Sequence, residues 1–137
     1  MITSQFQGKV LVTGGEVVDV DVEIKLTFDE ENDPLAVTMI IGIPDEGEVV
    51  WEFGRELLRV GSQSIVPHGK GDVRFRALGN NWPESGLIAC LHNGEDHADL
   101  GLPLDRVRDF LAATECAIDG TLISARLDDA LKEILGS

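Results

Sequence analysis

At 137 residues, with 43% hydrophobic residues, the chain is long enough to bury a core, and we expect one domain spanning residues 1–137. It has no apolar run near the roughly 20 residues that cross a bilayer, and its opening segment MITSQFQGKV does not resemble a signal peptide, so we expect a cytoplasmic protein without membrane insertion. The net charge of −14 argues against nucleic-acid binding, which depends on clustered Lys and Arg.

The charge is uneven along the chain. Residues 1–54 carry 12 acidic and 2 basic side chains, which gives −10. Residues 55–76 carry 2 acidic and 5 basic side chains, which gives +3, and residues 77–137 carry 11 and 4, which gives −7. The middle segment is therefore the one place where positive charge locally exceeds negative charge.

The first part of the chain predicts a meander of four antiparallel strands. Apolar and polar residues alternate from Val18 to Phe28, which is the period of a strand with one solvent-exposed face. Gly14 and Gly15 separate this strand from residues 5–13 and suit the positive backbone angles of a tight hairpin. The turn sequences ENDP and PDEG then bound two further strands, LAVTMIIGI and EVVWEF.

A junction between sheet and helix follows. Trp51 and Phe53 fall on one face of the fourth strand, which we expect to be buried. The next segment, RELLRV, predicts a short helix with Leu57 and Leu58 directed inward. The helix is expected to expose three charged residues to solvent, Arg55, Glu56 and Arg59.

The second part predicts three more strands and two helices. The strands are GDVRFRA, GLIACLH and HADLGL, with a hairpin at Asn93 and Gly94 between the last two. One helix lies within residues 101–116 and another near Ala125–Leu135. Each helix has an apolar stripe, formed by Leu104, Val107, Phe110 and Leu111 in the first and by Leu127, Leu131, Ile134 and Leu135 in the second.

The window 92-HNGEDH-97 with Asp99 contains nitrogen and oxygen ligands that a metal ion could use. Solvated hairpin residues are the favoured interpretation, because the window also contains the hairpin turn and no fixed Cys/His spacing supports a metal site. We therefore predict no metal. Cys90 and Cys116 are far apart in sequence and are expected to be reduced, buried thiols.

Catalysis is not predicted. Ser62, Ser64 and His68 include a hydroxyl and a base, but their segment is typical of a loop and contains no G-x-S-x-G elbow. The acidic residues show no spacing that singles out a general acid and base. We expect neither catalytic residues nor a cofactor.

Nucleic-acid binding needs aromatic rings and positive charge on the same surface. In strand 71–77 the alternation places Phe75 on one face and Arg74 and Arg76 on the other. Trp82, in the loop NNWPES, is a candidate contact residue, with folding back onto its own domain an equal alternative.

Three motifs, 32-NDPLAV-37, 51-WEFGRELL-58 and 69-GKGDVRF-75, resemble in order and spacing those of the SsgA-like sporulation and cell-division proteins of actinobacteria. A fainter likeness continues through 103-PLDRVRDFLAATE-115 and 127-LDDALKEIL-135, which are similar to that family's two closing helices. The residues that match the motifs include Asp33, Pro34, Trp51, Phe53, Arg55, Leu58, Gly71, Asp72, Val73 and Arg74. Leu35 and Glu52 depart from the family pattern.

The resemblance implies an α+β fold with two antiparallel sheets and C-terminal helices, similar to the two strands-then-helix repeats of the whirly single-strand-binding proteins. It also implies a non-enzymatic adaptor that forms a homotrimer and helps to position division septa by recruiting a partner such as the tubulin-like protein FtsZ. The alternative is a single-stranded nucleic-acid-binding protein. That function would use an exposed surface formed by Arg55, Arg59, Lys70, Arg74 and Arg76.

Overall fold

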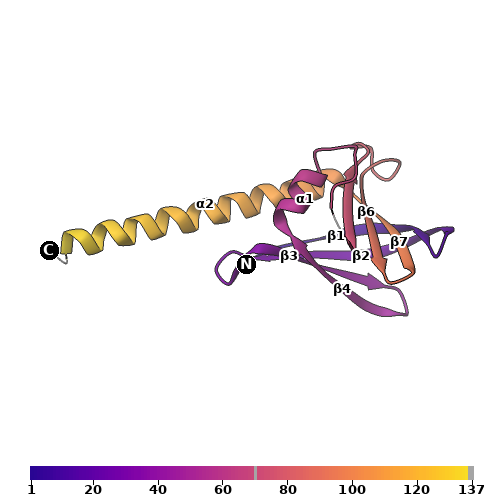
Figure 1. Ribbon diagram of the computed structural model, residues 1–137, viewed down its shortest axis with the longest axis horizontal. Coiled ribbons are helices and arrows are strands. Elements are labelled where there is room, and N and C mark those ends of the chain that lie inside the picture. Colours follow the sequence, from indigo (N-terminus) through magenta and orange to yellow (C-terminus); the bar gives the residue numbers. More distant parts are fainter. Residues whose placement is uncertain (70, 136–137) are drawn as a thin grey trace.

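Strands dominate the first three quarters of the chain, and a long helix follows them (Figure 1). The computed structural model describes residues 1–69 and 71–135, without the side chains of residues 121–125, 128 and 133–135. The described elements, in chain order, are β1 Ile2–Thr13, β2 Glu16–Asp29, β3 Asp33–Ile43, β4 Gly47–Gly54, α1 Arg55–Gly61, β5 Val73–Ala77, β6 Leu87–Asn93, β7 Asp96–Leu102 and α2 Leu104–Leu135. These elements agree with the predicted strands, while the helical end differs.

All seven described strands belong to one antiparallel sheet in the order β4-β3-β2-β1-β7-β6-β5. Strand β1 joins the two halves, because it pairs with β2 on one side and with β7 on the other, where Val10 lies opposite Leu100. The predicted division into two sheets is therefore wrong. The alternation of residues along β1 indicates which side chains face the core. It does not indicate which strands pair with β1.

Three tight hairpins lie at the same end of the sheet. Gly14 and Gly15 have φ values of 58° and 82°, which confirms the predicted turn between β1 and β2. Asp45 and Gly47 adopt φ values of 64° and 91° between β3 and β4, and Gly94 adopts 66° between β6 and β7. Turn chemistry predicted these connections because each needs residues that tolerate positive φ.

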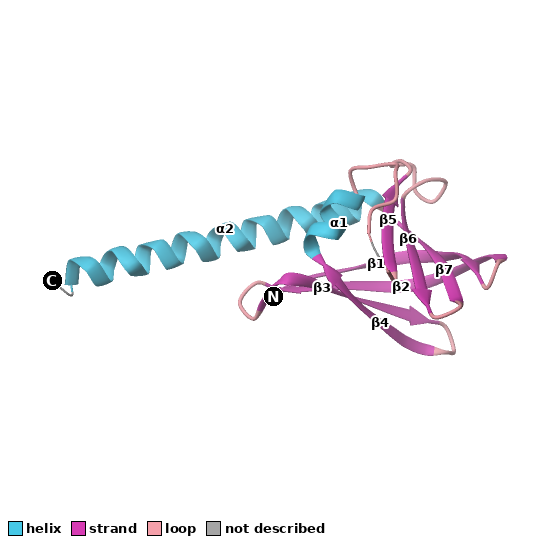
Figure 2. Ribbon diagram, viewed as in Figure 1, coloured by secondary structure: helices cyan, strands magenta, loops and turns pink. Residues whose placement is uncertain are grey.

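The sheet curls until its two outer strands approach each other (Figure 2). The rings of Phe53 on β4 and Phe75 on β5 meet edge to face, with centroids 4.9 Å apart. Phe53 is 7% exposed and Phe75 is fully buried, as their strand faces predicted. The result is a curled half-barrel whose concave side holds the core.

Helix α1 and the loop after it cover the outer edge of β5. The backbone of His68 exchanges two hydrogen bonds of 2.9 Å with Phe75, and the Ala77 amide donates to the Ser64 carbonyl at 2.7 Å. A Cβ added at Gly61 would lie 2.4 Å from the Cβ of Phe75, so this glycine allows α1 to approach the strand. Strand β4, at the other end of the sheet order, pairs only with β3 among the described strands.

Helix α2 is a single helix of 32 residues, where the sequence predicted two. Its start packs against the sheet through Leu104, Val107, Phe110 and Leu111, as predicted. The remainder projects well beyond the sheet (Figure 1). Gly120 lies between the two predicted helices, but a glycine costs only about 1 kcal/mol in a helix interior and does not end the helix.

The predicted second stripe of the C-terminal helix is not buried against the sheet. Leu127 and Leu131 are 59% and 54% exposed, while Ile134 and Leu135 lie outside the described side chains. Neither described helix combines the length and the apolar character that a membrane span requires.

Candidate interaction surfaces

An apolar hollow of about 430 Å³ opens on the concave side of the sheet, next to the three hairpin turns. Valine, isoleucine and leucine side chains from six of the seven strands form its walls, together with Trp51. The apolar wall residues are Val10, Val18, Val20, Ile41, Ile43, Val49, Trp51, Leu91, Ala98 and Leu100. Its volume falls within the range of small-molecule and side-chain pockets, and no described helix covers it.

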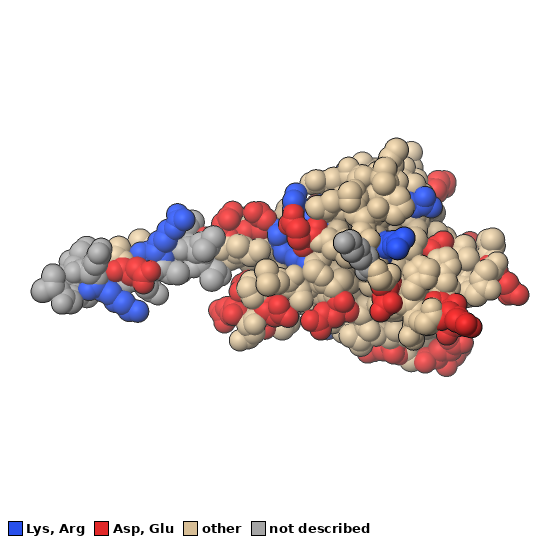
Figure 3. Space-filling model, viewed as in Figure 1, with Lys and Arg blue, Asp and Glu red and all other residues tan. Residues whose placement is uncertain are grey.

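The polar groups at the hollow come from the hairpins. Glu46 lies in the turn between β3 and β4, and Asp96 and His97 begin β7. Acidic side chains also gather along the lower edge of the body in Figure 3, the side on which β3 and β4 lie in Figure 1. The hollow thus combines apolar walls with acidic groups, on a chain with a net charge of −14.

The motif at residues 51–58 joins this hollow to the helices. Trp51 is half-buried and lines the hollow, so it is both a core residue and part of an accessible wall. Phe53 and Leu58 are buried in the core, as predicted. Arg55 was expected to be exposed, but its side chain is only 11% exposed and contacts α2.

Arg55 on α1 links the two helices through two side chains of α2. Its Nε donates to the Thr114 hydroxyl at 2.8 Å, and a terminal nitrogen pairs with the Glu115 carboxylate. Thr114 is fully buried and donates in turn to the Leu111 carbonyl at 2.6 Å. Arg59 instead pairs with Glu56 one turn away on α1 and stays on the surface.

The other two motifs are structural in different ways. Asp33 and Pro34 are exposed at the start of β3, beyond the first β3–β4 pair at Ala36, so the proline removes no hydrogen bond to β4. Gly71 has a φ of 74° in the turn before β5. Asp72 follows, exposed, and its carbonyl accepts from the His92 amide at 2.8 Å.

Val73 and Arg74 complete that motif on opposite faces of β5. Val73 is buried on the core side, whereas Arg74 is exposed on the convex side, in the register position opposite Cys90. Arg76 follows on the same side as Arg74, where it is half-buried. The predicted separation of Phe75 from these two arginines is confirmed.

Trp82 folds back onto its own domain, the second of the two alternatives. Cβ atoms added at Gly86 and Gly101 would lie 3.0 and 3.3 Å from its ring. Ser62 and His68 do not form a nucleophile and base. The buried Ser62 hydroxyl donates to the Arg59 carbonyl at 2.8 Å, and the backbone of His68 bridges to Phe75.

A polar cluster lies on the convex side of β6 and β7. His97 Nε2 is 2.8 Å from Asp99 Oδ1, and the rings of His92 and His97 stack with centroids 4.6 Å apart. Cys90 is half-buried, and burial raises the pKa of its thiol, with a further rise from the Asp99 carboxylate. Cys116 is exposed on α2, so the prediction of two buried thiols is wrong for this residue.

Sequence reasoning missed the hollow and the side chains that surround Cys90. The apolar alternation of β2 continues through Val18 and Val20 to the hairpin end of the strand. The sequence predicts no helix that would cover these two side chains. These uncovered apolar residues are the feature of the sequence from which the hollow could have been predicted. No local pattern in the sequence indicates the neighbours of Cys90, because His97 and Asp99 follow it by seven and nine residues, across a hairpin.

Comparison with known families identifies the family of this chain. The model of the Streptomyces sporulation and cell division protein SsgA matches residues 22–120, which is most of the chain. The chain belongs to the SsgA family. The resemblance carried by the three motifs is thereby confirmed, and all three motifs lie within the matched range. Among curated proteins, none matches the chain.

Two solved structures of this family's proteins are similar to the chain. One is of SsgB from Streptomyces coelicolor, in which mutations correlate to longitudinal cell division during sporulation. It has a TM-score of 0.67 and 26% sequence identity, and the match covers 85% of this chain and 87% of that one. The other is an SsgA-like sporulation-specific cell division protein from Thermobifida fusca. It has a TM-score of 0.72 and 24% identity over 94% of each chain, which shows the shared fold.

Proposed function

We propose that this SsgA-family protein is a non-enzymatic adaptor of cell division during sporulation, acting in the cytoplasm and at division septa as one domain. The observation that carries the proposal is the family match over residues 22–120, because the family is described by sporulation and cell division. The adaptor would act by recruiting a septation protein of the FtsZ type. No cofactor is required for this role.

The hollow supports recruitment by protein contact. Its apolar walls include the half-exposed Val20 and Val49 and the half-buried Trp51, and such a surface gains free energy when apolar side chains of a partner cover it. Glu46 and Asp96 at the hollow favour basic residues beside those apolar ones. The proposed occupant is therefore a segment of the division protein that combines apolar and basic side chains.

Assembly into a homotrimer is part of the proposal. Leu127 and Leu131 are four residues apart on the projecting part of α2, so they share one helix face, and both are more than half exposed. Copies of the same chain offer one another the matching stripe. Three copies would hold several partner molecules together and raise their local concentration.

Single-stranded nucleic-acid binding by a whirly-like sheet is the second candidate. The observation in its favour is that Arg74 and Arg76 make no hydrogen bond or ion pair to any described residue. Arg55 and Arg59 are engaged with acidic side chains, and Lys70 lies outside the described residues. Because Phe75 is buried on the opposite face, it offers no stacking platform beside these arginines, which favours the adaptor.

A pair of neighbouring valines on β4 tests the hollow. Val49 lines it, whereas Val50 points to the other side of the strand and is 62% exposed. Val49→Glu should weaken capture of purified FtsZ about ten-fold or more, because a charge would have to be buried at the contact. Val50→Glu introduces the same charge on the other face and should leave capture unchanged.

Capture is measured by surface immobilisation of the full chain and titration with the FtsZ-type protein. Circular dichroism of both variants checks that the fold is retained. Absence of binding by the parent chain contradicts the proposed partner. Equal loss in both variants contradicts the hollow as the docking site.

A further inference from the structure

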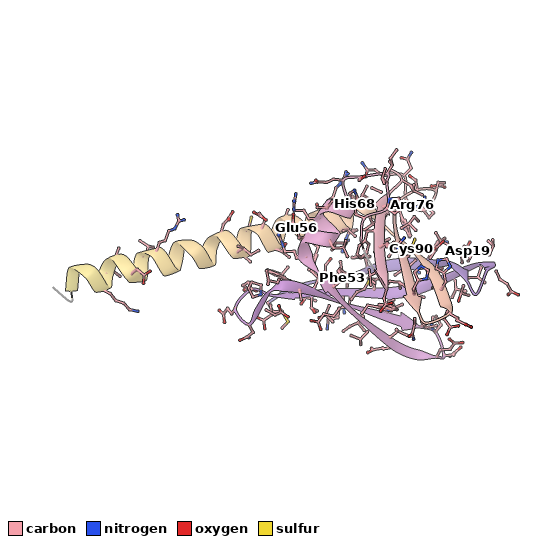
Figure 4. The ribbon with its side chains drawn as sticks, viewed as in Figure 1. Asp19, Phe53, Glu56, His68, Arg76 and Cys90 are labelled. Carbon is pink, nitrogen blue, oxygen red and sulfur yellow. The ribbon has the colours of Figure 1, made fainter. Side chains whose placement is uncertain are left out.

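The convex side of the β6–β7 hairpin brings together a thiol, two imidazoles and a carboxylate. Cys90 on β6 lies directly opposite Asp99 on β7, and His92 lies opposite His97. Residues two apart on one strand face the same side of a sheet, so all four side chains belong to one surface. Figure 4 labels Cys90 on this hairpin, with Arg76 on the neighbouring strand.

Three of these side chains converge. A ligand atom from each of Cys90, His97 and Asp99 lies within 4.8 Å of the other two. Ligands at the usual 2.0–2.3 Å from a tetrahedral zinc ion are separated from each other by roughly 3.3–3.8 Å. Small side-chain rotations therefore bring this set to the separation that a zinc ion requires, without movement of the strands.

The closest pair shows where an ion would sit. His97 Nε2 and Asp99 Oδ1 are 2.8 Å apart, the distance of a hydrogen bond. An ion bound to both atoms would take the place of the shared proton and widen this distance by about half an ångström. The two side chains are 37% and 24% exposed, so solvent ions have access to the site.

The chemistry of the three ligand atoms determines which metal ion fits the site. A thiolate, an imidazole and a carboxylate form a borderline-soft set that suits Zn²⁺, whereas Mg²⁺ and Ca²⁺ require oxygen ligands. Three protein ligands also leave a fourth tetrahedral position for water, as in zinc sites that exchange ligands. The second imidazole, that of His92, stacks on His97 at an interplanar angle of 15° and holds the orientation of its ring.

The charges around the site are compatible with such an ion. Arg74 and Arg76 face the same side from β5, and Arg74 lies opposite Cys90 in the register. A Zn²⁺ ion with one thiolate and one carboxylate has a formal charge of zero, so the arginines face a neutral centre rather than a cation. The buried Nε of Arg76 lacks a hydrogen-bond partner among the described residues and remains available to a polar group at the site.

We propose that Cys90, His97 and Asp99 bind one Zn²⁺ ion on the convex side of the β6–β7 hairpin, with water as the fourth ligand. The site lies on the opposite side of the sheet from most of the walls of the hollow, and His97 is the one ligand that also borders the hollow. Its effect on the fold would be to fasten β6 to β7 near their turn, since the ligands come from both strands.

Cobalt is the probe that tests the proposal, because Co²⁺ occupies zinc sites and absorbs light. Tag-free, reduced full-length protein is titrated with Co²⁺ and followed by absorption. We expect a thiolate-to-cobalt charge-transfer band that saturates at one equivalent per chain and disappears when Zn²⁺ is added. Absence of a charge-transfer band, or a band that Zn²⁺ does not remove, overturns the proposal.

The two cysteines provide a matched pair of variants. Cys90→Ser should abolish the charge-transfer band, whereas Cys116→Ser removes the exposed thiol on α2 and should leave the band unchanged. His97→Gln keeps both thiols and should weaken Co²⁺ binding about ten-fold or more, since even second-shell losses cost that much. A band that survives Cys90→Ser, or that is lost in Cys116→Ser, overturns the assignment; circular dichroism confirms folding in each case.

Discussion

Arg55 begins helix α1, yet its guanidinium contacts two residues of helix α2 that lie 59 and 60 positions later in the chain. The contact partners differ in character, since Thr114 is fully buried and Glu115 is on the surface. A planar guanidinium satisfies both partners at once because its donors are fixed in a fork. Arg55 therefore holds α1 against the part of α2 where the long helix leaves the sheet.

Replacing this arginine should destabilise the fold. Arg55→Ala removes the hydrogen bond to Thr114 and the pairing with Glu115, and we expect the free energy of unfolding to fall by about 1–3 kcal/mol. Arg59→Ala is the control, because it removes an exposed arginine that pairs only within α1, and it should change stability little. Urea denaturation measures both. Equal midpoints for the parent and Arg55→Ala would contradict the role of Arg55.

Sequence periodicity cannot find such a residue. In a helix of seven residues, the positions of Leu57 and Leu58 define the buried face, and Arg55 falls outside it. The second helix then covers Arg55 from the side, and that neighbour is encoded far along the chain. The same limit applies to Cys90, whose partners His97 and Asp99 are set by hairpin register and not by spacing.

At the scale of single elements, local chemistry predicts the strands and hairpins well. Gly14, Gly15 and Gly94 occupy turn positions with positive φ, and each turn fixes the register of the strands beside it. Helix α2 was less predictable. Gly120 lowers the helical propensity of the middle of α2, but the favourable residues on both sides carry the helix through it.

The projecting part of α2 makes a prediction about assembly. If Leu127 and Leu131 form the contact between copies, the double variant Leu127→Glu, Leu131→Glu should convert the parent from about three times the 14.8 kDa chain mass to the mass of one chain. Asp129→Asn lies on another face of the same helix and should leave the mass unchanged. Light scattering after size-exclusion chromatography gives the masses.

Either of two results would count against this contact. A parent protein that has the mass of one chain at micromolar concentration would contradict the trimer. A double variant that keeps the parent mass would show that copies associate through another surface, such as the open edge of β4. Helical content by circular dichroism distinguishes lost association from a melted helix.

At the scale of the whole molecule, the sheet closes through contacts that no local pattern predicts. Strand β1 has two neighbours, and its pairing with β7 merges the expected two sheets into one. Phe53 and Phe75 then meet across the curled sheet from its two outer strands. The inward direction of both rings followed from alternation, but their contact follows from the overall curvature, which depends on the twist of all seven strands.

Whole-molecule charge yields a test between the adaptor and the nucleic-acid-binding candidate. A net charge of −14 repels a polyanion at long range, and the two unpaired arginines on β5 lie within this field. Fluorescence anisotropy with a labelled single-stranded oligonucleotide should therefore detect no binding, even at low salt, where electrostatic attraction is strongest.

The double variant Arg74→Glu, Arg76→Glu provides the control for the oligonucleotide measurement, and it should behave like the parent. Tight binding that falls steeply with salt and is lost in the double variant would instead support the second candidate. In that case, the local positive surface on the convex side of β5 would outweigh the charge of the remaining chain. Because salt screens both the repulsion and any local attraction, the comparison of the two proteins at one low salt concentration isolates the contribution of these arginines.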